Sequence, residues 1–133
     1  MQKTAKRQGP VKLKEAVIRG IADKKGKNIV CLNMSKVSGT ICDYFVICEG
    51  DSSVQVDTIA RSIEEEVLKT TGENVYHSEG FENSEWVLLD YVDVIVHIFQ
   101  PHIRSFYNLE ALWDDAEHEE IIIEQAYKHA QTK

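Results

Sequence analysis

The chain has 133 residues, of which 43% are apolar, and both values are typical of one globular domain with a single core. No apolar run approaches the roughly 18 residues that a membrane helix needs, and the first residues lack the apolar stretch of a signal peptide. The three cysteines are odd in number and lack metal-ligand spacing, as is usual for a reducing compartment. We therefore expect a cytoplasmic protein with no membrane partner.

The net charge of −7 is unevenly distributed along the chain. Residues 1–27 hold nine Lys and Arg against two acidic residues, a net of +7, and the remaining residues carry −14. This acidic body, residues 28–133, repels nucleic-acid phosphates and is steered towards basic surfaces, although the same charge also favours solubility. The sequence therefore predicts no sequence-specific nucleic-acid binding. Whether the basic N-terminal segment touches RNA stays open.

In chain order, residues 1–10 read as a flexible basic N-terminus and residues 11–25 as an amphipathic helix. Two short apolar strands, 28–34 and 43–49, are expected to pair antiparallel. A helix over 52–69 follows, in which Ser52 and Gln55 match a capping box, and 74–78 is a weak strand. Strand, helix and strand in this order imply at least one parallel pair.

Residues 84–99 form the strongest β pattern and predict a hairpin around Tyr91 and Val92. A loop of two or four residues would place Val87 opposite Val96 and Trp86 opposite His97. One face is then aliphatic and suited to pack under helices. The other face mixes large apolar and charged side chains, which is typical of partner sites, unless another segment such as the C-terminal residues covers it. Its members are Trp86, Leu88, Asp90, Asp93, Ile95, His97 and Phe99.

The C-terminal part predicts a short helix over 102–112 and a second helix over 115–130. In domain terms, a basic segment (1–10) precedes a main domain (11–116) and a helical extension (117–133). The fold class is α/β, with a mixed five-stranded sheet and helices mainly on one face.

The sequence gives little support to an enzymatic function. Gly50, Ser52 and Ser53 loosely resemble a phosphate-binding turn, but no glycine run or catalytic lysine follows, and the capping box explains Ser52. The histidines do not form a metal-binding motif, and nothing lowers the pKa of a cysteine. We expect no catalytic residue, no metal and no cofactor. A nucleotidyltransferase-like or other nucleotide-dependent enzyme is the alternative, and a homodimeric adaptor that uses the mixed hairpin face is a third.

The chain resembles the Iojap-type ribosomal silencing factors through several motifs in order, over roughly residues 11–116. They are Asp43-Tyr44-Phe45-Val46-Ile47, Gly50-Asp51-Ser52-Ser53-Val54-Gln55-Val56, Glu79-Gly80, Trp86-Val87-Leu88-Leu89-Asp90-Tyr91, Asp93-Val94-Ile95-Val96-His97-Ile98-Phe99, Arg104, Tyr107-Asn108-Leu109-Glu110 and Leu112-Trp113. The family usually has glycine where Val92 stands.

The resemblance implies a nucleotidyltransferase-like fold without catalytic residues, in a bacterial protein that represses translation. It implies binding to the large ribosomal subunit through the universal ribosomal protein number fourteen, which blocks subunit joining. The residues expected to bind the partner are Trp86, Leu88, Asp90, Asp93, His97, Phe99, Asp43 and Tyr44. Binding and structural roles are weighed equally for Arg104, Tyr107, Glu110 and Trp113.

Overall fold

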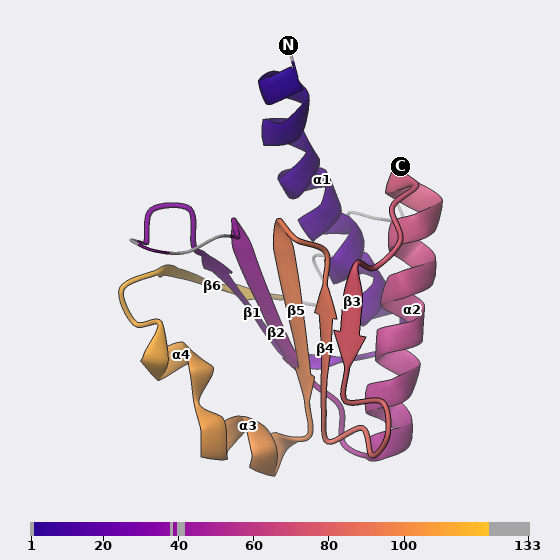
Figure 1. Cartoon of the computed structure of the whole chain (residues 1–133). Helices are drawn as coiled ribbons and strands as arrows, with labels where there is room; N and C mark the ends of the chain where they lie inside the picture. The colour runs from indigo at the N-terminus through magenta and orange to yellow at the C-terminus, as the bar shows by residue number, and fades with distance from the viewer. Residues whose placement is uncertain (1, 38, 40–41, 123–133) are drawn as a thin grey trace.

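The structure, a computed structural model, describes residues 2–37, 39 and 42–122, with side chains from Gly9 onward. The elements are α1 (Gln2–Asp23), β1 (Lys27–Asn33), β2 (Tyr44–Glu49), α2 (Ser53–Thr71), β3 (His77–Glu79), β4 (Trp86–Asp90), β5 (Val94–Phe99), α3 (Pro101–Tyr107), α4 (Leu109–Leu112) and β6 (Glu117–Ile121). The strands form one mixed sheet in the order β3-β4-β5-β2-β1-β6 (Figure 1). Among the strands of the described residues, only β2 and β5 are parallel, which confirms the expected parallel pair and the antiparallel pairing of β1 with β2.

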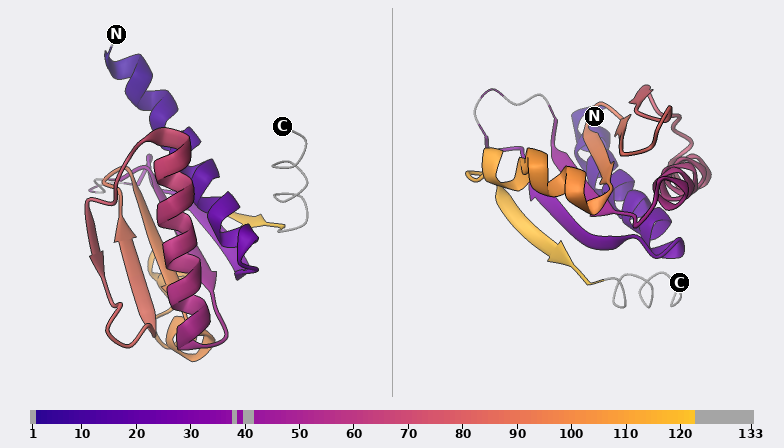
Figure 2. Two further views of the ribbon diagram at one scale, coloured as in Figure 1. Left: turned by 90° about the vertical axis from the view of Figure 1, so that its right-hand side faces the viewer. Right: turned by 90° about the horizontal axis from the view of Figure 1, so that it is seen from below.

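The two faces of the sheet carry two separate apolar clusters. Helices α1 and α2 lie side by side over one face (Figure 2), and their apolar stripes pack on residues such as Val46, Val94 and Val96. On the other face, α3, α4 and the turn that follows pack on Phe45, Ile95 and Phe99. Alternation along each strand sends neighbouring side chains into different clusters.

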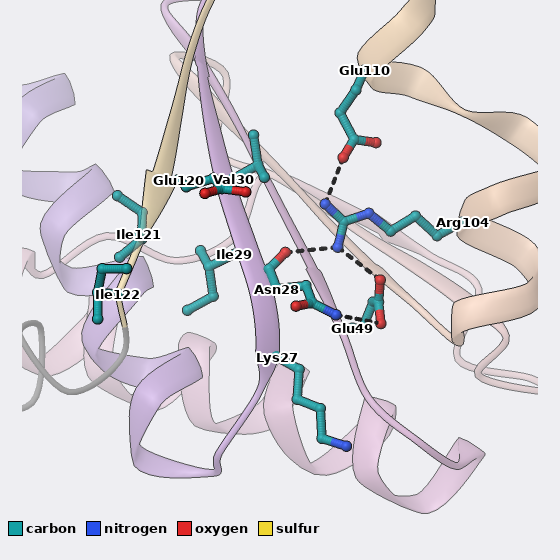
Figure 3. A pocket seen from close by; sticks show the side chains of 10 residues that line it. All are labelled: Lys27, Asn28, Ile29, Val30, Glu49, Arg104, Glu110, Glu120, Ile121 and Ile122. Atoms are coloured by element: carbon teal, nitrogen blue, oxygen red, sulfur yellow. Dashed lines mark hydrogen bonds and ion pairs between the residues drawn. The ribbon is translucent and has the colours of Figure 1, made fainter.

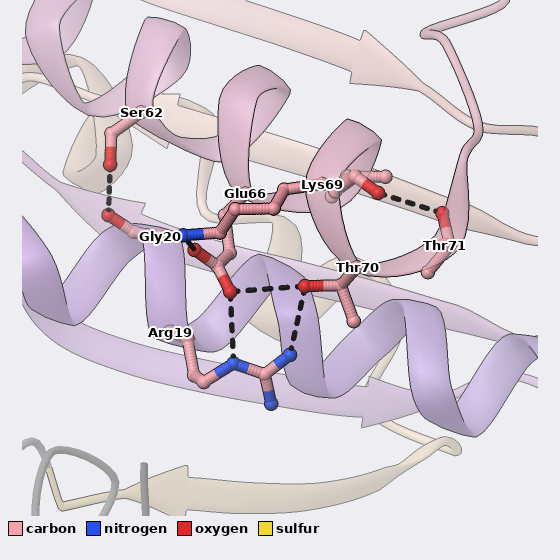
Figure 4. A network of polar contacts seen from close by, with 8 residues as sticks. Arg19, Gly20, Ser62, Glu66, Lys69, Thr70 and Thr71 are labelled. Carbon is pink, nitrogen blue, oxygen red and sulfur yellow. Dashed lines mark hydrogen bonds and ion pairs between the residues drawn. The ribbon is translucent and has the colours of Figure 1, made fainter. Parts of the chain in front are cut away.

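Close contact between α1 and α2 fixes the helical layer. A Cβ at Gly20 would lie 2.8 Å from the Cα of Ile63, so a side chain at position 20 would push the helices apart. Across the contact, the Ser62 hydroxyl donates to the Gly20 carbonyl at 2.9 Å, and Arg19 pairs with Glu66 at 3.1 Å (Figure 4). Burial opposes the charge on Glu66, but hydrogen bonds from Arg19 and Thr70 outweigh it and lower its pKa.

Capping residues set the ends of α2 as the sequence predicts. The Ser52 hydroxyl accepts from the Gln55 amide at 3.1 Å, and the Gln55 side chain accepts from the Asp51 amide at 2.7 Å. Gly72 ends the helix in the left-handed conformation, with φ of 79°. Ser52 is therefore a helix cap at this position, and its hydroxyl is already engaged.

The hairpin has the expected faces but a different register. Val87 pairs with Ile98 and Trp86 with Phe99, so the expected partners Val96 and His97 are displaced by two residues. The cause is the loop, which consists of Val92 and Asp93 rather than Tyr91 and Val92. A two-residue shift preserves the side-chain parity, and for this reason the aliphatic face still packs under the helices.

Three expected boundaries differ in the structure. Helix α1 begins at Gln2 rather than at residue 11, and the helix expected over 102–112 is divided by Asn108, whose φ is 48°. Residues 117–121 form β6 and not the start of the expected C-terminal helix, while 123–130 lie outside the described residues. Strand β6 pairs with β1, whose backbone groups would otherwise form an open sheet edge, and this pairing outweighs the helical preference of the glutamates. Over the described part of the chain, the sheet therefore has six strands rather than five.

Candidate functional site

The outer face of the hairpin carries an aromatic cluster, defined here as Phe45, Trp86, His97, Phe99, Tyr107 and Trp113. The indole of Trp86 packs at 4.8 Å, between ring centroids, from both Phe99 and Tyr107. Trp86 and Leu88 are half-buried, whereas His97 is 5% exposed and Phe99 1% exposed. Segment α3–α4 and the following turn therefore cover part of this face. His97 and Phe99 lie beneath this surface and expose almost no area that a partner could contact.

His97 holds the indole of Trp86 in place. The indole N–H of Trp86 donates to Nδ1 of His97 at 3.1 Å. Burial lowers the pKa of His97 to about 4, so the ring is neutral at pH 7 and, with Nδ1 accepting, carries its proton on Nε2. This Nε2 is buried and has no hydrogen-bond partner among the described residues. An unsatisfied buried N–H costs about 1 to 3 kcal/mol of folding stability. The hydrogen bond to His97 therefore orders the indole of Trp86 at a cost in stability.

Three carboxylates lie at the opposite end of the hairpin and form what we call the acidic edge, namely Asp43, Asp90 and Asp93. The backbone carbonyl of Asp93 accepts from the amides of Asp43 at 2.8 Å and Tyr44 at 3.1 Å, which brings the start of β2 next to the hairpin loop. Burial, and then the charge of Asp93, raise the pKa of Asp43. The like charges disfavour one another, and a cation placed at this edge would relieve that repulsion.

The aromatic cluster and the acidic edge are two separate regions. Trp86 and Asp90 stand at the two ends of β4, four residues apart, which corresponds to roughly 13 Å along a strand. Sequence parity places both on one face, and their spacing along the strand keeps the two regions apart. Tyr44 is half-buried at the acidic edge, where the ammonium of Lys14 lies 4.6 Å from its ring centroid.

Arg104 and Glu110 fasten α3 and α4 to the sheet. The Arg104 guanidinium donates to the Asn28 carbonyl at 2.7 Å and to the carboxylates of Glu49 at 3.0 Å and Glu110 at 2.6 Å (Figure 3). These groups line an open pocket of about 630 Å³, and Arg104 itself is 8% exposed. Because both terminal nitrogens of its guanidinium donate within the chain, the structure favours a structural role for Arg104 and Glu110.

The surface of α3 and α4 is more apolar than the sequence indicates. Tyr107 is 50% exposed and Trp113 half-buried against Phe45, and Phe106 and Leu112 are 78% and 67% exposed. On the helix that the sequence predicts over 102–112, Phe106 is available to pack. The buried stripe of α3 is instead centred on Ile103 and Arg104, about 120° away from Phe106 on the helix. The sequence does not indicate this stripe, because arginine is usually exposed in folded proteins.

The described residues contain no group of three or more His, Cys, Asp or Glu that could hold a metal ion. Burial raises the pKa of Cys31 to about 11 and also raises that of Cys48, so neither thiol is a ready nucleophile. No helix in the described part of the chain is long and apolar enough to span a membrane.

Comparison with known proteins identifies the family. A family model described as "Ribosomal silencing factor during starvation" matches residues 7–133. The chain belongs to the family of ribosomal silencing factors. A ribosomal silencing factor from Bacillus subtilis is 46% identical over 94 residues, which cover 71% of this chain and 78% of the relative. One from Halalkalibacterium halodurans is 41% identical over 104 residues, covering 78% and 87%. A crystal structure from Chromobacterium violaceum, 38% identical, superposes with a TM-score of 0.72 over 77% of this chain and 83% of that one. The α/β fold expected from the sequence is therefore that of solved members of the family.

Proposed function

We propose that this protein is a non-enzymatic translation repressor of the bacterial cytoplasm. It binds the large ribosomal subunit through the universal ribosomal protein number fourteen and sterically blocks the joining of the small subunit. The family supports the ribosomal role, and the partner protein comes from the resemblance. The observation that supports the site is the acidic edge, where Asp43, Asp90 and Asp93 gather without a cation paired to them in the described ion pairs.

In this proposal each part of the outer hairpin face has its own task. Asp43 and Asp93 receive lysine or arginine side chains of the partner, and Tyr44 flanks them from the helix-covered face of the sheet. Trp86 and Leu88 supply the apolar contact, with His97 and Phe99 holding the indole from below. Tryptophan anchors of this kind are enriched among residues whose loss costs about 2 kcal/mol or more of binding. A homodimer that uses the same face would compete with the ribosomal partner.

Sedimentation with purified subunits tests the function. We expect the protein to co-migrate with large subunits and to prevent the formation of whole ribosomes when small subunits are added. Free formation of whole ribosomes in its presence would contradict the proposal. Clear binding of a nucleoside triphosphate with Mg²⁺ in calorimetry would contradict its non-enzymatic part.

A pair of charge variants tests the site. Asp43→Asn with Asp93→Asn should weaken binding to large subunits by at least about tenfold, because two carboxylates that face the partner are lost. Glu15→Gln with Glu65→Gln removes the same charge from exposed positions on α1 and α2, behind the sheet, and should change binding little. Equal effects of the two pairs would mean that net charge matters and the acidic edge does not.

A further inference from the structure

The first half of α1 combines strong positive charge with little involvement in the core. Residues 1–14 hold Lys3, Lys6, Arg7, Lys12 and Lys14 and no acidic residue. The first residue of α1 in the apolar core is Leu13, and the helix upstream of it projects beyond the strand ends in both side views (Figures 1 and 2). A Cβ at Gly9 would meet nothing within 4 Å. The segment upstream of Leu13, which we call the basic arm (residues 2–12), is not part of this core cluster.

Several basic residues in the second half of α1 and just after it pair with carboxylates of the chain. Arg19 pairs with Glu66 and Lys27 with Asp51. Among the described side chains, neither Lys12 nor Lys14 forms an ion pair, and Lys14 lies over the neutral ring of Tyr44. Positive charge is therefore left for a partner outside the chain.

We propose that the basic arm binds ribosomal RNA phosphates beside the protein-binding site. The arm starts from the end of the sheet that carries the acidic edge, since Lys14 contacts Tyr44 and the Tyr44 amide is bonded to Asp93. The surface of a ribosomal subunit places phosphates next to basic proteins, so an acidic edge and a basic arm at one end of the molecule complement both. The arm also offsets the repulsion between phosphates and a body of charge −14.

The inference rests on the proposed function, and its test keeps the two apart. Affinity is measured as a function of salt concentration against two probes, purified large subunits and the isolated ribosomal protein number fourteen. The variant is Lys3→Gln with Lys6→Gln and Arg7→Gln. Its matched control is Lys24→Gln with Lys25→Gln and Lys27→Gln, in the turn after α1 and at the start of β1.

Loss of three phosphate contacts should reduce the slope of log affinity against log salt by roughly 2 to 3 for large subunits. The arm variant should also bind subunits at least about tenfold more weakly at low salt. Its affinity for the isolated protein should not change, and the control should keep the wild-type slope for subunits.

Three outcomes would overturn the inference. The arm variant could bind subunits with wild-type affinity and slope, or both variants could lose equal affinity. Alternatively, the arm variant could lose binding to phosphatidylglycerol vesicles while keeping its affinity for subunits, which would assign the arm to anionic membranes. A wild-type protein that binds neither probe would contradict the proposed function itself.

Discussion

Val92 shows how one residue can strain a loop on which the candidate site depends. It is the first of the two loop residues of the hairpin and has φ of 76°, a conformation that is costly for a β-branched residue and ordinary for glycine. Its amide donates to the Asp90 side chain at 2.7 Å, and the next residue, Asp93, holds the start of β2. The surrounding bonds therefore keep Val92 in a conformation that it does not favour.

Replacement of Val92 by glycine should raise the free energy of unfolding. The relief of strain, about 1 to 3 kcal/mol, exceeds the entropy that glycine gains in the unfolded chain, so we expect a net gain of about 1 kcal/mol. Urea unfolding measures it. Val92→Ala keeps a Cβ and should gain less. An unfolding free energy that is lower in Val92→Gly than in the wild type would show that the valine side chain stabilises the loop.

His97 makes stability depend on pH. Its folded-state pKa of about 4 lies below the ordinary 6.5, so the unfolded chain takes up a proton first as the pH falls. The free energy of unfolding should therefore fall by up to about 3 kcal/mol between pH 6.5 and pH 4 from this group, and stay constant above that range. Urea unfolding across this range tests the sign.

The variant His97→Gln isolates this contribution. Glutamine retains an acceptor oxygen for the Trp86 indole and does not titrate, so the variant should lose less stability than the wild type over the same range. Parallel profiles for the two proteins would show that another group carries the pH dependence.

At the scale of the elements, the sequence predicts the features that depend on neighbouring residues. It does not predict those that depend on contacts between distant segments. The capping box of α2 and the face alternation of the hairpin depend on a few neighbouring residues, and the structure confirms both. The hairpin register depends on the conformation of Val92, and β6 depends on pairing with β1, far away in the sequence. The candidate site shows the same difference between local features and those set by tertiary packing. Parity puts Trp86 and Asp90 on one face, but only the packing of α3 and α4 shows which residues remain exposed.

Arg104 joins α3 and α4 to the sheet, and its loss should mainly reduce stability. Arg104→Ala leaves the carboxylates of Glu49 and Glu110 without their cation, which we expect to lower the free energy of unfolding by about 3 kcal/mol or more. Lys69→Ala removes an exposed cation that pairs with Glu66 and should cost less than about 1 kcal/mol. Urea unfolding compares the two. An Arg104→Ala variant with wild-type stability and weaker subunit binding would make Arg104 a partner contact.

For the whole molecule, the separation of charge predicts how the protein finds its partner. The acidic body should steer it towards a basic ribosomal protein, so the association rate with the isolated protein should fall at least about tenfold between about 50 mM and about 500 mM salt. The dissociation rate should change less, because apolar contacts at Trp86 and Leu88 are not screened. Stopped-flow measurements separate the two rates. In Asp43→Asn with Asp93→Asn the salt dependence should weaken, since neutral amides replace the two carboxylates nearest the partner. A wild-type association rate that does not change with salt would mean that recognition rests on the apolar surface around Trp86, with the acidic edge serving only solubility.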